Sequence, residues 1–91
     1  AITQGKEDLL LLDVREPHEY SLGHLPGAKL IPLKELPQRV GELDPERWIV
    51  VYCRSGHRSL TAGAYLKLLG FSRVENLQGG FLAWATGYSG H

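Results

Sequence analysis

One cysteine, Cys53, stands where an apolar stretch of the sequence gives way to a polar, cation-rich one. The run from Trp48 to Tyr52 precedes it, and the five residues after it include Arg54, His57 and Arg58. Neighbouring cations or a helix N-terminus lower the pKa of a free thiol from about 8.5 to roughly 3.5–7.5, which favours the nucleophilic thiolate. The alternative is a small buried hydrophobe, the usual role of an unpaired cysteine. A core position would not attract three basic side chains, so the pattern favours a reactive thiolate.

The elements around Cys53 are predicted to be a strand, a tight loop and a helix. The apolar run 48–52 is too short for a helix and rich in β-branched and aromatic residues, which indicates a strand buried on both faces. Apolar residues then recur at helical spacing, and Gly70 is the expected C-cap, so a helix is predicted over 59–69. The cysteine would lie between a strand end and a helix start, where open α/β sheets bind ligands and helix N–H groups attract anions.

The short loop could curl around its own sulfur. Gly56 permits a turn that a side chain would block, and the N–H groups of residues 54–59 would then form an anion-binding nest. Such a nest suits attack on a phosphoester or on the outer sulfur of an anion such as thiosulfate. The tyrosine-phosphatase signature places an arginine six positions after the cysteine, whereas here Ser59 occupies that position and Arg58 comes one residue early. A cysteine phosphatase is therefore disfavoured, because the loop is too tight for a phosphoryl group.

The remaining chain is predicted to alternate strands with short helices. Further strands are expected over 9–14, 28–32 and 74–77, and helices over 17–22, 33–43 (interrupted at Pro37) and 81–85. This alternation predicts an α/β protein with a central parallel sheet of four to five strands and helices on both faces, a three-layer α/β/α arrangement. Asp13 and Cys53 would both end parallel strands and so lie at one edge of the sheet.

Composition limits the possible partners. The 91 residues form one small domain, with a hydrophobic content of 43% and a charged content of 22% that are ordinary for a folded chain. Ten basic residues balance ten acidic ones, so no overall charge favours nucleic acid or a membrane. No apolar run is long enough to span a bilayer and nothing resembles a signal peptide, so a cytoplasmic location is expected. The single cysteine cannot form an internal disulfide, and the four histidines lack metal-binding spacing, so no metal is expected.

Three segments together resemble the family of rhodanese-like sulfurtransferases: LLDVREPHEYSLGHLPGA (11–28), VVYCRSGHRS (50–59) and LQGGFLAW (77–84). The resemblance implies a single rhodanese domain over 1–91, working without a cofactor. It also implies that Cys53 accepts a sulfane sulfur as a persulfide within the six-residue loop Cys53 to Arg58. Related phosphatases and arsenate reductases of the same fold carry a loop one residue longer. A strand and helix usually precede the D-x-R strand, but only eight residues stand there, so the family's first strand is expected to be missing before residue 1.

The resemblance also implies roles for individual residues. Cys53 would be catalytic, with Arg58 as the best of the substrate ligands, which would be Arg54, Ser55, Gly56, His57, Arg58 and Ser59. Three supporting residues match family motifs: Asp13 and Arg15 the D-x-R pattern, and His24 the G-H-I-P-G-A pattern, with Leu25 in place of its isoleucine. Structural alternatives remain for all three: Asp13 could bind loop amides, Arg15 could pair with Glu19, and His24 could fix a turn.

The expected activity is that of a thiosulfate sulfurtransferase. A sulfane sulfur would pass from thiosulfate, or another such donor, through the persulfide to cyanide or to a thiol acceptor such as thioredoxin or glutathione. The alternative is a sulfur-relay or regulatory module that docks a partner protein. Neither interpretation involves nucleic acid or a membrane.

Overall fold

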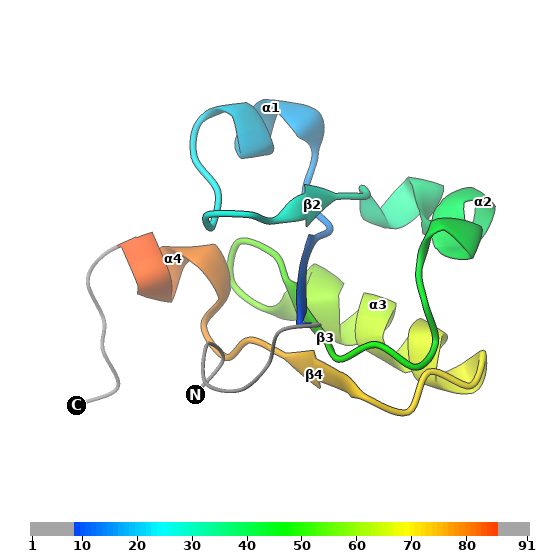
Figure 1. Ribbon diagram of the computed structural model, residues 1–91. Helices are drawn as coiled ribbons and strands as arrows, with labels where there is room; N and C mark the ends of the chain where they lie inside the picture. Colours follow the sequence, from blue (N-terminus) through cyan, green and yellow to red (C-terminus); the bar gives the residue numbers. More distant parts are fainter. Residues whose placement is uncertain (1–8, 86–91) are drawn as a thin grey trace.

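The computed structural model describes residues 9–85 and places four parallel strands in one sheet, in the order β2-β1-β3-β4 (Figure 1). The strands are β1 (Leu10–Asp13), β2 (Lys29–Leu30), β3 (Ile49–Tyr52) and β4 (Val74–Asn76). The predicted parallel sheet is confirmed, and each expected strand is present. The weakest prediction, 28–32, is reduced to the two residues of β2.

Within residues 9–85, four α-helices accompany the sheet: α1 (Pro17–Ser21), α2 (Leu36–Arg39), α3 (His57–Leu68) and α4 (Gly80–Ala85). The predicted helix over 33–43 is in three pieces, because 3₁₀ turns at Leu33–Glu35 and Val40–Glu42 flank α2. Pro37 lies in the first turn of α2, where its missing N–H group is not needed. The helix predicted over 59–69 begins two residues earlier and ends at Leu68. Gly56 allows this early start, since its φ of 112° turns the chain directly into α3.

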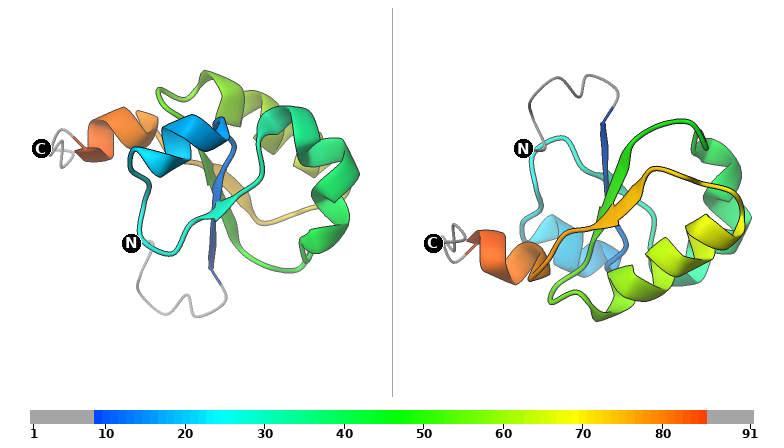
Figure 2. Two further views of the ribbon diagram at one scale, coloured as in Figure 1. Left: turned by 90° about the horizontal axis from the view of Figure 1, so that it is seen from above. Right: turned by 90° about the horizontal axis from the view of Figure 1, so that it is seen from below.

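The helices cover both faces of the sheet, which confirms the three-layer arrangement. Ile49 and Val51 of β3, and Cys53 after it, pack in a large core with Ala62 and Leu66 of α3. Tyr52 points to the opposite face, into a smaller cluster with Tyr20 of α1 and Phe81 of α4. Both views of Figure 2 show α1 and α4 toward one side of the strands and α2 and α3 toward the other. Each residue of β3 is at most 2% exposed, as expected of a central strand with apolar cores on both faces.

The strand register brings the predicted site residues to one edge of the sheet. Asp13 is paired with Tyr52, so β1 and β3 end side by side and Cys53 follows at the same edge. The side chains, however, lie on opposite faces. Leu12 and Val14 pack in the α3 core, so Asp13 between them points to the α1 face, whereas Cys53 points to the α3 face.

One expectation from the sequence falls on the start of the chain, since the family's first strand was expected to be missing before residue 1. Residues 1–8 and 86–91 lie outside the described part. Between residues 9 and 85, no helix has the length and apolar character needed to cross a membrane. In the same range, no three His, Cys, Asp or Glu side chains are grouped so that they could hold a metal ion.

Candidate active site

The Cys53 sulfur lies against the backbone of its own loop. It accepts hydrogen bonds from the amide of Gly56 at 3.0 Å and from the amide of Ser59 at 3.4 Å, and it lies 3.5 Å from Ser59 Oγ. Cys53 is only 1% exposed and packs at the end of the α3 core. Its surroundings are therefore two-sided, with apolar side chains below the sulfur and converging N–H groups above it. An inert core thiol has no need of such donors, because neutral sulfur is a weak acceptor.

These contacts set the ionisation of the thiol. Burial raises the pKa of Cys53, but hydrogen bonds from the Ser59 hydroxyl and from the amides of Ser59, Gly56 and Ser55 outweigh it, so the pKa is lowered overall. The sequence suggested two causes for a lowered pKa, nearby cations and converging loop amides. The causes that lower it most are hydrogen bonds, including those from the amides. Arg58 also interacts with the thiolate, since the Cys53 charge contributes to raising the pKa of Arg58 after the larger effect of Glu19.

Helix α4 orients the loop that holds the sulfur. The first N–H groups of a helix have no partner within it, and here the amides of Phe81 and Leu82 donate to the carbonyls of Cys53 at 2.8 Å and Arg54 at 3.0 Å. A peptide's C=O and N–H groups point in opposite directions. With the Arg54 carbonyl held by α4, the Ser55 amide faces the sulfur.

Gly80 makes this contact possible. A Cβ at this position would lie 2.4 Å from the Cys53 carbonyl oxygen and 2.8 Å from that of Arg54, closer than real Cβ atoms approach. The glycine also has a φ of +59°, which L side chains rarely adopt. The segment LQGGFLAW is therefore part of the site, a role that the sequence motif did not reveal.

Ser59 connects the loop to β4. Its side chain is fully buried, and its hydroxyl lies 3.1 Å from the Gly56 carbonyl oxygen and within hydrogen-bond contact of Asn76 Oδ1. Asn76 was not among the predicted site residues. A signal for it was present, because Asn76 is a polar residue near the end of a predicted parallel strand, as Asp13 is.

Arg58, the best predicted substrate ligand, forms a two-point ion pair with Glu19 of α1. The distances from its two terminal nitrogens to the Glu19 carboxylate oxygens are 2.7 and 2.9 Å. Mainly because of this hydrogen bonding, the pKa of Glu19 falls to about 2. The Glu19 carboxylate also accepts a hydrogen bond from the backbone of Glu16 at the start of α1. Arg58 therefore joins α3 to α1 across the loop, while the predicted ligands Arg54 and His57 are exposed.

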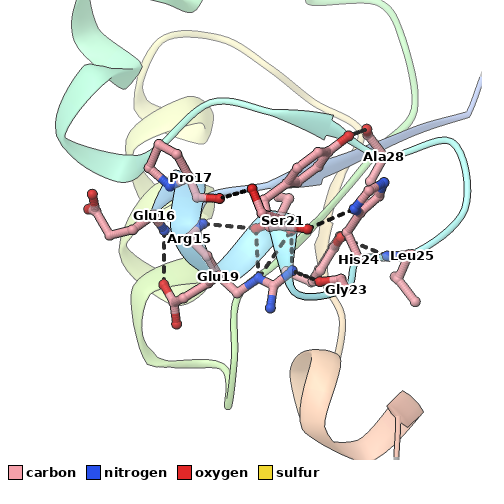
Figure 3. Close-up of polar contacts among 12 residues, drawn as sticks. Arg15, Glu16, Pro17, Glu19, Ser21, Gly23, His24, Leu25 and Ala28 are labelled. Atoms are coloured by element: carbon pink, nitrogen blue, oxygen red, sulfur yellow. Dashed lines mark hydrogen bonds and ion pairs between the residues drawn. The ribbon is translucent and has the colours of Figure 1, made fainter.

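Asp13 and Arg15 form a buried pair on the α1 face. Arg15 donates to Asp13 through its backbone amide, Nε and a terminal nitrogen, and also to the Gly23 carbonyl at 2.6 Å (Figure 3). The direct partner of Arg15 is therefore Asp13, and Glu19, which was suggested for this role, acts on Arg15 only through its charge. Residues two apart in an extended strand share a face, so Asp13 meets the guanidinium first, and Glu19 pairs with Arg58. The Arg15 guanidinium lies 4.4 Å from the centre of the Phe81 ring, which links this pair to the start of α4.

His24 fixes a turn, as its structural alternative proposed. Its Nδ1 lies 2.9 Å from the Tyr20 carbonyl oxygen, and its ring stacks on that of Tyr20 with centroids 3.7 Å apart (Figure 3).

Of the predicted site residues, Ser55, Gly56 and Ser59 surround the sulfur. Asp13, Arg15 and His24 organise the opposite face.

We expect Gly80→Ala to disturb the loop more than a glycine replacement that causes strain alone. Gly27 is the matched control, since it has a φ of +81° and open space around it. Gly27→Ala should cost about 1–2 kcal/mol for the left-handed backbone. Gly80→Ala should cost more in urea unfolding and should raise the pKa of Cys53, measured by alkylation rate against pH. Equal costs with an unchanged thiol pKa would show that the α4 contact does not orient the loop.

We expect Glu19→Gln to remove part of the acid sensitivity of the fold. The pKa of Glu19 is lowered from 4.5 to about 2, so its stabilising effect is complete above pH 4.5 and is lost as pH falls toward 2. Compared with the wild type, the variant should melt at a lower temperature at neutral pH. It should lose less stability as the pH falls from 4.5 to about 2. Glu75→Gln, at an exposed position of β4, is the control. Parallel melting curves of Glu19→Gln and wild type across this range would contradict the assignment.

Comparison with known proteins identifies the family. The chain matches the rhodanese-like domain over residues 2–86. It is 48% identical over 79 residues to a sulfurtransferase of Allochromatium vinosum, covering 87% of this chain and 74% of that protein. It is 34% identical over 84 residues to the thiosulfate sulfurtransferase GlpE of Pseudoalteromonas translucida, covering 92% and 80%. The crystal structure of a rhodanese-related protein from Thermoplasma volcanium matches with a TM-score of 0.83 and 31% identity, covering 88% and 79%. The chain therefore belongs to the rhodanese-like sulfurtransferase family.

Proposed function

We propose that this protein transfers a sulfane sulfur from thiosulfate to cyanide or to a thiol through a persulfide on Cys53. The observation that carries the proposal is the convergence of the Gly56 and Ser59 amides on a thiol whose pKa is lowered. The similarity to GlpE, named as a thiosulfate sulfurtransferase, supports thiosulfate as the donor.

In the first step the Cys53 thiolate attacks the outer sulfur of thiosulfate. A bond forms between Sγ and that sulfur, the S–S bond of thiosulfate breaks, and sulfite leaves with the electron pair. No proton moves, because the nucleophile is already ionised. Burying the thiolate charge costs free energy, and the hydrogen bonds from the loop amides offset that cost.

In the second step the acceptor attacks the outer sulfur of the persulfide. Cyanide leaves as thiocyanate, or a thiolate acceptor leaves as its own persulfide, and the electrons of the broken S–S bond return to Cys53 as the thiolate. The two half-reactions form a ping-pong cycle. Electrons balance between donor and acceptor, so the cycle calls for neither a cofactor nor a metal.

The basic side chains around the loop would act on the anionic donor. Arg54 is exposed beside the loop, where its charge can attract thiosulfate, and His57 is exposed next to it. Arg58 would be a weaker ligand than a free cation, because Glu19 compensates part of its charge. We propose acceptor thiols of the glutathione or thioredoxin kind and a cytoplasmic setting, where such thiols are kept reduced.

Loop length supports sulfur transfer over phosphate chemistry. Helix α3 begins at His57, which leaves only residues 53–56 to turn between β3 and the helix. Two donors to the sulfur come from that turn and from the first turn of α3, at Gly56 and Ser59. These donors converge on a single sulfur atom, that of Cys53.

We expect thiosulfate to add one sulfur atom to Cys53, detected by intact-protein mass spectrometry and removed by cyanide. Cys53→Ser should take up no sulfur and should have no thiosulfate:cyanide activity, because oxygen cannot form the persulfide. Circular dichroism should show that this variant keeps the fold. Activity in Cys53→Ser would exclude the mechanism. Loading from a thiol persulfide but not from thiosulfate would instead show that the donor was assigned wrongly.

We expect Arg58→Ala to raise the apparent KM for thiosulfate several-fold, because it removes a cation that interacts with the sulfur. Glu19→Gln should lower that KM, since it leaves the Arg58 charge uncompensated. Arg73→Ala, at an exposed position next to β4, controls for the loss of one positive charge. Equal KM values in all three variants would make Arg58 a structural link between α1 and α3 and not a substrate ligand.

A further inference from the structure

The hydroxyl group of Ser59 has one proton and three possible acceptors. The Gly56 carbonyl oxygen lies 3.1 Å away, the Cys53 sulfur lies 3.5 Å away, and Asn76 Oδ1 is also in hydrogen-bond contact. A neutral Cys53 thiol can donate its own proton to Ser59 Oγ, which leaves the hydroxyl proton for the Gly56 or Asn76 oxygen. A thiolate has no proton to donate and needs the hydroxyl proton itself. A hydroxyl that donates to Gly56 or Asn76 beside the thiol would therefore have to turn toward the sulfur to stabilise the thiolate.

We propose that Asn76 is a positioning residue that controls the direction of the Ser59 hydroxyl. When Cys53 is a thiol, the Asn76 amide oxygen accepts the Ser59 proton. When Cys53 is a thiolate, the amide turns so that its nitrogen donates to Ser59 Oγ, and the hydroxyl donates to the sulfur. An amide side chain suits this role because it carries an acceptor and a donor on one rotatable group.

The surroundings of Asn76 give its amide room to turn. Ser59 and Asn76 both line a cavity of about 210 Å³ between α3 and β4, whose other walls include Gly63, Ala64 and Val74. Asn76 is only half-buried, whereas Ser59 is completely buried. The hydroxyl is therefore held in place while the amide beside it borders open space.

The Asn76 side chain is not needed to attach β4 to the sheet. The backbone of β4 pairs with β3 in the register of Val51 with Asn76, and the Leu77 amide donates to the Val51 carbonyl at 2.9 Å. Strand pairing therefore survives replacement of the side chain. What the side chain adds is its contact with the hydroxyl that touches the Cys53 sulfur.

The test measures the ionisation of Cys53 by its alkylation with iodoacetamide against pH, with no sulfur donor present. Asn76→Asp can only accept from Ser59 and should raise the midpoint by about one pH unit, the scale of one lost charge-assisted hydrogen bond. Asn76→Ala releases the hydroxyl and should leave the midpoint unchanged or lower it. Gln78→Glu, at an exposed position just beyond β4, controls for adding a carboxylate nearby.

A second set of variants tests whether Asn76 acts through Ser59. In a Ser59→Ala background, the shift caused by Asn76→Asp should shrink to that of Gln78→Glu. A shift that keeps its full size in this background would overturn the proposal, since it would arise from charge alone. Equal increases in Asn76→Asp and Asn76→Ala would also overturn it, because they would indicate a general loosening of the loop. If Asn76→Asp does not fold, a raised midpoint in Asn76→Ala still contradicts the proposal, and a lowered midpoint that disappears in the Ser59→Ala background supports it.

The inference rests on the proposed function only in that the thiolate is the attacking group. Alkylation involves no thiosulfate and no persulfide, so a negative result would leave the sulfur-transfer proposal intact. Conversely, a Cys53 that takes up no sulfur from any donor would leave the Asn76 effect on thiol ionisation unchanged.

Discussion

The direction of the peptide groups that follow Cys53 is the constraint on which the site depends. A buried thiolate is stable only where donors converge on it, and the backbone supplies them only if its carbonyls point away. Helix α4 does this for the first two peptide groups, by donating from Phe81 and Leu82 to the carbonyls of Cys53 and Arg54. Gly80 allows the approach because it has no side chain. Through the Ser55 amide, the start of one helix thus helps to lower the pKa of a thiol in another part of the chain.

The buried Asp13–Arg15 pair on the opposite face of the sheet helps to hold α4 in place. A buried ion pair contributes stability only when its hydrogen bonds are satisfied. Asp13 and Arg15 meet this requirement with several mutual bonds and a further bond to Gly23. The Arg15 guanidinium then lies against the Phe81 ring. The three segments that carry the family resemblance are therefore in physical contact: D-x-R supports α4, α4 orients the cysteine loop, and the loop holds the sulfur.

The sequence predicted the parts of this arrangement that depend on local patterns. Unbroken apolar runs located β1 and β3, and their parallel pairing brought Asp13 and Cys53 to one edge of the sheet. Which side chains meet there depends on contacts between distant segments, such as Ser59 with Asn76 and Arg58 with Glu19. No local pattern encodes them. The start of α3 was missed for a different, local reason: Gly56 both turns the loop and caps the helix.

Hydrogen bonds and exposed charges act on different steps in this site. The amides of Gly56 and Ser59 are buried with the sulfur, so dissolved salt screens them little, and they set the population of thiolate. Arg54 and His57 are exposed, and their effect on an approaching anion is screened by salt. Arg58 stands between the two groups, because Glu19 compensates its charge while the thiolate still interacts with it. In the sulfur transfer that we propose, the geometry of the fold would prepare the nucleophile, and the positive charge at the surface would attract the sulfur donor.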